Sequence, residues 1–476
     1  MGHFDPSLMR VVMETSSLFP DDVLLDAGNP LRRNLDGVFD RQDFSAHLVR
    51  SEFHRAMVVA HEQRHYLDYH LTNYGSWVSR FWGQVKQTVP ALLGMSGSLI
   101  VPIHFMEDEV MTSFYEVPMP IPDSHQWLGV RLAANHARRV RRDHYSAKRA
   151  PHGFSGGAQL EALATTFEVG PAEWLLPMNE AIEVVASMPR NMVRWREEYV
   201  WLGDILAALD IGPPPVLLGE GGQAVNTRIW PPILVASLMG RFENLFASKL
   251  DEDPDLWHRI APSSRLLDIL KWLHERCSGK LRSVSDVWNA VNEACLDLYG
   301  EDVVSAMTAD TQWMKRILDD FVGRANSSPP VDLLAHVRTR LLVAEEFAAN
   351  PMPFIDPIVA WTQADSASTR LVPEYHFASR SGFRNIPVDL TPFDSMFYHP
   401  VAGKTFFVKP RTNAVVGEMQ RVDEEFSAVA RFLVRGAASP SWVGPEREAV
   451  ARWLVAGKGI YVVPPFGDDL DVLLAP

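Results

Sequence analysis

The feature that most constrains the fold is the segment of residues 58–67, which reads VVAHEQRHYL. Apolar residues recur at helical spacing on both sides of it, so we predict a helix over residues 48–72. A helix turns by about 100° per residue, which places His61 and His65 one turn apart on the same side. An apolar stripe lies next to them on the helical wheel, formed by Phe53, Met57, Ala60, Leu67 and Leu71. The pattern therefore predicts paired imidazoles at the edge of a core-facing side.

Most of the remaining sequence also has helical periodicity. It predicts helices over residues 172–209, 228–250, 264–278, 284–299, 303–324 and 331–349. Short strand-like stretches occur at residues 98–105, 405–408, 414–416 and 460–463, and the second and third of these are expected to form a hairpin. The expected fold class is therefore mainly α with small β elements.

The histidine pair suggests metal chemistry. Neutral imidazoles at this spacing suit Zn²⁺, which binds nitrogen ligands in a tetrahedral arrangement. Glu62 projects from the neighbouring face of the helix, where it could accept a proton from a metal-bound water without being a ligand. Asp68 lies on the face of His65 and is expected either to orient a ligand histidine or to be a ligand itself. Arg64 falls within the apolar stripe and needs a carboxylate partner, from the protein or from a substrate.

A second helix is predicted at residues 155–168, which read SGGAQLEALATTFE. The two segments together resemble the gluzincin group of zinc metallopeptidases, which pair an HExxH helix with a glutamate ligand on a downstream helix. The resemblance implies a zincin-like site on two helices, with His61, His65 and Glu161 as ligands and Glu62 as the catalytic base. Further candidates for the third ligand are Glu168, Asp68, His144 and His152. A metzincin site is excluded because Asp68 and Leu71 stand where that motif requires Gly and His.

Length and turn signals predict several domains, since 476 residues exceed one ordinary core. Breaks at the Pro-rich residues 212–215 and at residues 326–330 divide the chain. We predict an HExxH metal-binding domain over residues 1–212, a helical middle domain over residues 213–330 and a mixed α/β region over residues 331–476.

Composition and charge restrict the cellular location and the binding partners expected of this chain. A net charge of −14 argues against general nucleic-acid binding, and no apolar run reaches the roughly 20 residues that cross a bilayer. The first residues do not resemble a signal peptide, and the two cysteines, Cys277 and Cys295, fit a reduced core, so a cytoplasmic location is expected. The basic segment of residues 131–149 is either a solvated helix and connector or a docking patch for an acidic peptide or a nucleic-acid strand.

The sequence favours a zinc-dependent hydrolase, a metallopeptidase acting on a peptide or protein substrate. Two rival functions remain open. Two histidines and a carboxylate also suit Fe²⁺ and oxygen chemistry, which would make the chain a peptide-modifying enzyme. The second rival is a non-catalytic helical interaction protein, in which the HEQRH segment is a relic or a coincidence.

Overall fold

The computed structural model describes fifteen segments of the chain. They are residues 2–5, 10–14, 50–80, 99–101, 156–175, 216–218, 223–225, 227–242, 259–323, 331–362, 374–379, 382–386, 395–399, 404–408 and 460–462. These residues are mostly helical, so the prediction of a mainly helical chain is confirmed for them. Among them, no helix combines the length and apolar character that crossing a bilayer requires. The cytoplasmic location and the domain boundaries at residues 212 and 330 stay predictions.

The helices are α4 (Arg50–Leu71), α7 (Gly156–Leu175), η3 (Thr227–Ile229), α10 (Trp230–Ser237), α12 (Pro262–Cys277), α13 (Val284–Tyr299), α14 (Val303–Gly323), α15 (Val331–Ala349), α16 (Met352–Ile355) and α17 (Pro357–Thr362). Four predicted helices, α12 to α15, begin and end within two residues of their predicted bounds. Their strong periodicity reflects helices that each bury one face and expose the other.

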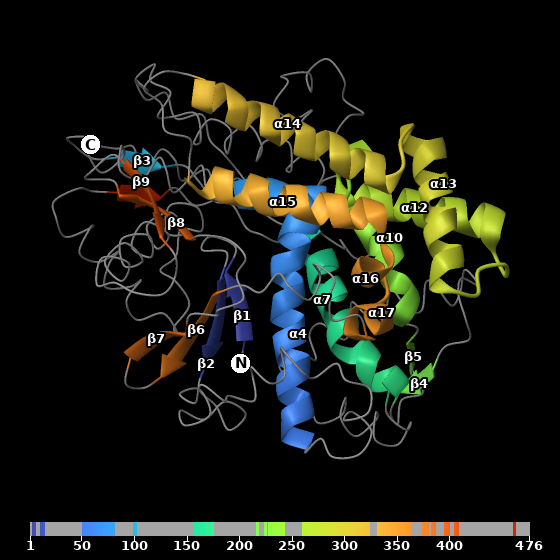
Figure 1. Ribbon diagram of the computed structural model, residues 1–476. Helices are drawn as coiled ribbons and strands as arrows, with labels where there is room; N and C mark the ends of the chain where they lie inside the picture. The colour runs from blue at the N-terminus through green and yellow to red at the C-terminus, as the bar shows by residue number, and fades with distance from the viewer. Residues whose placement is uncertain are drawn as a thin grey trace.

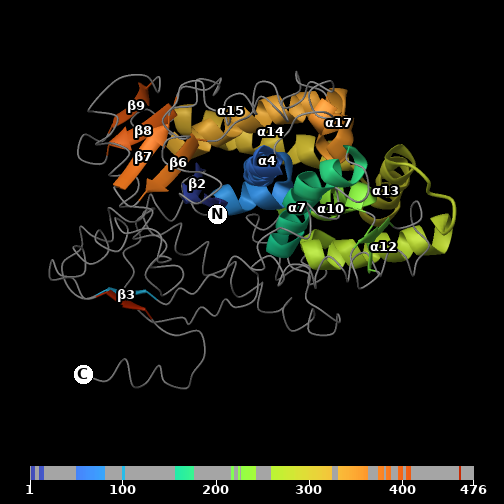
Figure 2. The same ribbon diagram turned by 90° about the horizontal axis from the view of Figure 1, so that it is seen from below.

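The helices are arranged around α4 and α7, which lie side by side (Figures 1 and 2). Helix α15 crosses one end of α4, and α14 packs on α15 (Figure 1). On the other side of α7 lie α10 and α17, while α12 and α13 pack on α10. Elements from all three predicted regions therefore meet at the α4–α7 pair.

Helix α4 is buried on all sides along its second half. Between residues 67 and 80 every residue is buried, polar ones included. Leu67 and Leu71 of the predicted apolar stripe are buried, and the polar side is buried as well, because α7, α15 and strand β1 all pack against the helix. The helix is interrupted at Thr72, whose hydroxyl donates to the Asp68 carbonyl at 2.8 Å and accepts from the Gly75 amide at 3.0 Å. Helical structure resumes over residues 73–80.

The helix predicted over residues 228–250 ends early. Helix α10 ends at Ser237, and the chain turns through residues 238–242. A Cβ at Gly240 would lie 2.3 Å from the Ile260 carbonyl oxygen, so the two backbones are in direct contact there. This close approach between residues 20 apart is a tertiary constraint, which local periodicity does not reveal. Residues 243–250 lie outside the described residues.

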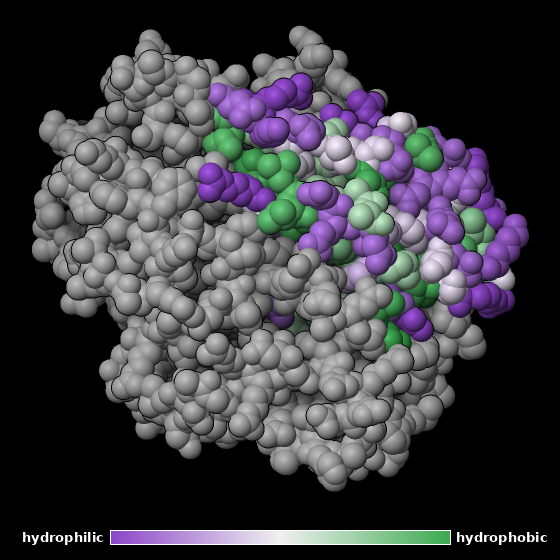
Figure 3. Space-filling model, in the orientation of Figure 1, coloured by the Kyte–Doolittle hydropathy of each residue, from purple (hydrophilic) through white to green (hydrophobic). Residues whose placement is uncertain are grey.

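Helices α12 and α13 show local signals that fix their bounds. Ser283 and Asp286 form a capping box at the start of α13, and Gly300 ends it with a φ of 78°. Trp272 and Trp288 are buried, and Trp313 packs against the cluster of Met314, Leu318 and Val337. The outer surface over α12 and α13 is mostly hydrophilic with small apolar patches (Figure 3).

Short strands accompany the helices. They are β1 (Gly2–Asp5), β2 (Arg10–Glu14), β3 (Leu99–Val101), β4 (Val216–Leu218), β5 (Gln223–Val225), β6 (Glu374–Ser379), β7 (Gly382–Ile386), β8 (Ser395–His399), β9 (Lys404–Val408) and β10 (Ile460–Val462). The order β1-β2-β6-β7 forms the largest sheet, and β1 packs against α4. Strand β9 pairs with the preceding β8, whereas residues 414–416, the predicted hairpin partner of residues 405–408, lie outside the described residues.

Candidate metal centre

Helices α4 and α7 bring three predicted ligands to one point. His61 Nε2 and His65 Nε2 are 3.1 Å apart. One carboxylate oxygen of Glu161, Oε2, lies 3.5 Å from His61 Nε2 and 3.2 Å from His65 Nε2. Both histidines are buried, whereas the Glu161 side chain is 34% exposed, so the cluster is open to solvent on the α7 side. Among the described residues, this is the group of metal-binding side chains that converges on one position.

The spacing of the three donor atoms fits a zinc ion. Tetrahedral coordination with metal–ligand bonds of about 2.0–2.1 Å places neighbouring donors roughly 3.3–3.4 Å apart. The three separations here run from 3.1 to 3.5 Å and bracket that value. The two imidazole planes are inclined at 83°, with the ring centroids 4.7 Å apart. The residues present therefore fit a three-coordinate protein site with an open fourth position.

Glu168 holds the outer nitrogen of His61. Its Oε2 lies 2.9 Å from His61 Nδ1, and the carboxylate is almost fully buried. Glu168 follows Glu161 by two helical turns, which puts both on the same side of α7. An imidazole that donates from Nδ1 to a carboxylate keeps the Nε2 lone pair for a metal. Glu168, a candidate for the third ligand on sequence grounds, thus lies on the far side of the His61 ring instead.

Glu62 is buried beside the cluster without being part of the donor triangle. Its Oε2 is a buried oxygen with no hydrogen-bond partner among the described residues. Burial raises the pKa of the Glu62 carboxyl, the charges of Glu161 and Glu168 raise it further, and His61 and His65 oppose the rise. A carboxyl group with a raised pKa holds a proton more readily than an exposed one, which suits a group that exchanges protons.

The ligand charges influence one another strongly. Burial lowers the pKa of His61, but the carboxylates of Glu168, Glu161 and Glu62 outweigh it and hold that pKa well above the ordinary value. For Glu161 burial raises the pKa, yet His65 and His61 bring it well below the ordinary value. Without a metal, the cluster therefore favours an ionised Glu161 and a protonated His61.

Asp68 and Arg64 form a buried ion pair one turn along α4. The Arg64 Nη2 lies 2.7 Å from Asp68 Oδ1, and Arg64 Nε donates to Asp68 Oδ2 at 3.0 Å. Both carboxylate oxygens are thereby taken by one guanidinium. Asp68 is therefore neither a ligand nor the residue that orients a ligand histidine, contrary to the two roles predicted for it. The partner that Arg64 needed comes from the protein.

Phe4 completes the site from a distant part of the sequence. Its ring on β1 stacks on the His65 imidazole, with centroids 6.1 Å apart and planes inclined at 22°. No motif indicated this contact, because Phe4 and His65 are 61 residues apart in the sequence. His144 and His152, two further candidates for the third ligand, lie outside the described residues, as does the basic segment of residues 131–149.

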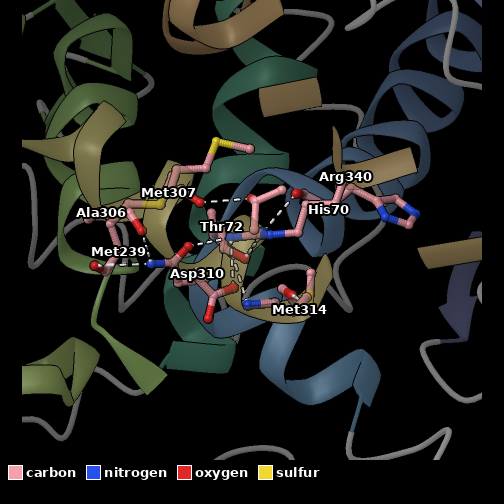
Figure 4. Close-up of polar contacts among 12 residues, drawn as sticks. His70, Thr72, Met239, Ala306, Met307, Asp310, Met314 and Arg340 are labelled. Carbon is pink, nitrogen blue, oxygen red and sulfur yellow. Dashed lines mark hydrogen bonds and ion pairs between the residues drawn. The ribbon is translucent and has the colours of Figure 1, made fainter. Parts of the chain in front are cut away.

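Beyond the ligand pair, α4 leads into a buried polar network (Figure 4). Arg340 of α15 donates to the carbonyls of His70 and Thr72 at 2.8 and 2.9 Å, and its guanidinium lies 3.1 Å from Asp310 Oδ2. Asn73 donates to the Ala306 carbonyl at 3.2 Å. The polar groups at the interrupted end of α4 are thus satisfied by the Arg340 side chain of α15 and by the Ala306 carbonyl of α14.

Comparisons with protein-family models, curated proteins and solved structures found no match to this chain.

Proposed function

We propose that this chain is a zinc-dependent hydrolase that cleaves a peptide bond. The observation that carries the proposal is the donor triangle of His61, His65 and Glu161, with the buried Glu62 carboxyl beside it. Three protein ligands with an open fourth position are typical of catalytic zinc, whereas structural zinc sites are closed by four.

Bound zinc would polarise the scissile carbonyl and lower the pKa of a water molecule at the open position. The protein supplies the remaining parts. Glu62 accepts a proton at its unpartnered Oε2 and returns it to the leaving amine. Glu168 keeps the Nε2 face of His61 directed into the site, and Phe4 restrains the His65 ring by stacking.

The ion pair of Arg64 with Asp68 bears on the substrate. Because Arg64 is buried and bound to Asp68, it does not offer a cation for a substrate carboxylate. We therefore propose that the substrate is held through its peptide backbone and side chains, with no terminal carboxylate bound at Arg64.

Elemental analysis and turnover test the proposal on purified full-length protein. We expect near-stoichiometric zinc in the wild type, loss of zinc in His65→Ala, and retained zinc without peptidase activity in Glu62→Gln. The Glu62→Gln variant is the matched control because it keeps the side-chain shape and the metal ligands. Ferrous iron with oxygen-dependent activity would instead support a peptide-modifying iron enzyme. An active Glu62→Gln variant, or a wild type that binds no metal after reconstitution, would refute the hydrolase proposal.

A further inference from the structure

Arg64 contacts three different structural elements at once. On α4 it pairs with Asp68, and its guanidinium lies over the Phe167 ring of α7 at 3.8 Å from the ring centroid. From the same position Nη1 donates to the Phe354 carbonyl of α16 at 2.7 Å. The three partner residues are all buried. One side chain thus joins the metal helix, the helix that carries Glu161, and a segment almost 300 residues away in sequence.

The α16–α17 segment is fixed from a second side. Arg228 of η3 donates from Nε and Nη2 to the two carboxylate oxygens of Asp356 at 3.2 and 2.7 Å. Asp356 lies between α16 and α17, and its Oδ1 also accepts from the Ile358 amide at 3.0 Å. Helix α17 packs against α7 (Figure 1). The segment is therefore tied to α4 through Phe354 and to η3 through Asp356, while α17 packs against the helix that bears Glu161 and Glu168.

We infer that Arg64 is a positioning residue through which the α16–α17 segment sets the separation of α4 and α7, and hence the fit of the metal centre. The inference rests on the proposed metal centre. Arg64 neighbours the ligand His65, and Phe167 neighbours Glu168, so a shift at this junction moves a ligand on α4 and, on α7, the carboxylate that contacts His61. It assigns residues 352–362 a role in building a site whose ligands are His61, His65 and Glu161.

Geometry explains why an arginine is needed here. The planar guanidinium can bind a carboxylate through two nitrogens, stack on an aromatic ring and still donate to a carbonyl. A lysine at position 64 keeps one positive charge for Asp68 but cannot make all three contacts together. The donor atoms are 3.1 to 3.5 Å apart, so even a small shift of α4 relative to α7 would spoil their fit to a metal ion. Loss of a residue that supports the ligands typically lowers the affinity of a metal site by about 10–100-fold.

The test uses Arg64→Lys and the double variant Arg64→Met with Asp68→Val. The double variant removes both buried charges, so it avoids the unpaired charge that would destabilise either single deletion. Arg340→Lys is the matched control, since Arg340 is also a buried arginine that binds an aspartate and backbone carbonyls, but on the His70–Asn73 segment. Zinc affinity is measured by chelator competition at temperatures where every variant is folded, with the visible spectrum of Co²⁺-loaded protein as a geometric readout.

We expect zinc affinity to fall about tenfold in Arg64→Lys and at least as much in the double variant, with an altered Co²⁺ spectrum. Arg340→Lys should bind zinc within about twofold of the wild type even where it unfolds more easily. Unchanged affinity and spectrum in a folded double variant would overturn the inference, as would an equal loss in Arg340→Lys.

Amide hydrogen exchange on metal-free protein separates this inference from the proposed function. Both Arg64 variants should exchange faster in α7 and α16–α17, and Arg340→Lys should not. A wild type without zinc would overturn the metal centre, while the exchange pattern would still decide whether Arg64 ties these elements together. Unchanged exchange in both Arg64 variants would refute that tie.

Discussion

A buried histidine pair should make the stability of this protein depend on pH in a predictable way. The rings of His70 and His336 stack with centroids 4.7 Å apart, and both residues are buried. Neither ring nitrogen of His70 has a hydrogen-bond partner among the described residues. Burial lowers the pKa of His70 to about 3, and the nearby Arg340 charge contributes in the same direction. His70 is therefore neutral in the folded protein and takes up a proton on unfolding below pH 6.5.

The size of the effect follows from the two pKa values. The unfolded chain binds a proton at His70 below the ordinary histidine pKa of 6.5, whereas the folded protein does so only near pH 3. Stability from His70 is therefore fully present above pH 6.5 and is lost as the pH falls from 6.5 towards 3. At pH 5 the difference of about 1.5 pH units corresponds to about 2 kcal/mol, because one unit is worth about 1.4 kcal/mol. His336, whose pKa burial and His70 also lower, adds to the loss.

The perturbation is His70→Phe, which keeps an aromatic ring between Tyr66 and His336 and removes the titrating group. Denaturant unfolding is measured at about pH 7 and pH 5 with a metal chelator present, so that metal release does not contribute. Between these values the wild type should lose about 2 kcal/mol more than the variant. Carboxyls whose pKa burial raises, such as Asp68 and Glu62, titrate in both proteins and cancel in the comparison. The same pH dependence in both proteins would refute the reasoning.

Two further predictions concern Glu168 on α7 and the glycines at positions 75 and 300. Glu168→Gln should weaken zinc binding about tenfold and Glu168→Ala up to about a hundredfold, because a glutamine oxygen can still accept a hydrogen bond from His61 Nδ1. Zinc affinity is measured by chelator competition. If both variants bind zinc as tightly as the wild type, Glu168 does not support the metal centre. Gly75→Ala should destabilise the protein by more than the roughly 1–3 kcal/mol that overpacking a core typically costs, because its Cβ would lie 2.6 Å from the Asp68 carbonyl oxygen. Gly300 has open space around it and a φ of 78°, so Gly300→Ala should lower the free energy of unfolding by only about 1–2 kcal/mol. Both variants are measured by denaturant unfolding. A larger loss in Gly300→Ala than in Gly75→Ala would show that the close approach at Gly75 is relieved at little cost.

The sequence indicated those parts of the site that depend on local spacing. His61 and His65 are four residues apart, so they share one face of any helix that contains them. The resemblance to gluzincins indicated Glu161 as the third ligand. The capping residues Ser283 and Gly300 likewise announce the bounds of α13 locally. In each case the deciding interaction lies within one or two helical turns, where periodicity and capping rules apply.

The remainder depends on contacts between distant segments. The Phe4 ring on His65 and the Phe354 carbonyl on Arg64 carry no sequence signature, since any aromatic ring or any carbonyl could serve. Asp68 looked like a ligand because it shares a face with His65. Arg64 on the same helix competes for that carboxylate and binds both of its oxygens. The choice between these partners depends on burial, which a helical wheel does not give.

The charges around the centre support a bound cation. The carboxylates of Glu62, Glu161 and Glu168 gather around His61 and His65, while the fourth acidic group, Asp68, is paired with Arg64. Uncompensated charge in a buried setting costs several kcal/mol, so such a cluster requires a counter-charge or protons. The carboxylates hold the pKa of His61 well above its ordinary value, so a proton on this ring meets part of that requirement in the metal-free protein. A divalent cation would displace the proton of His61 and balance two charges, and zinc binding should therefore release protons and strengthen as the pH rises.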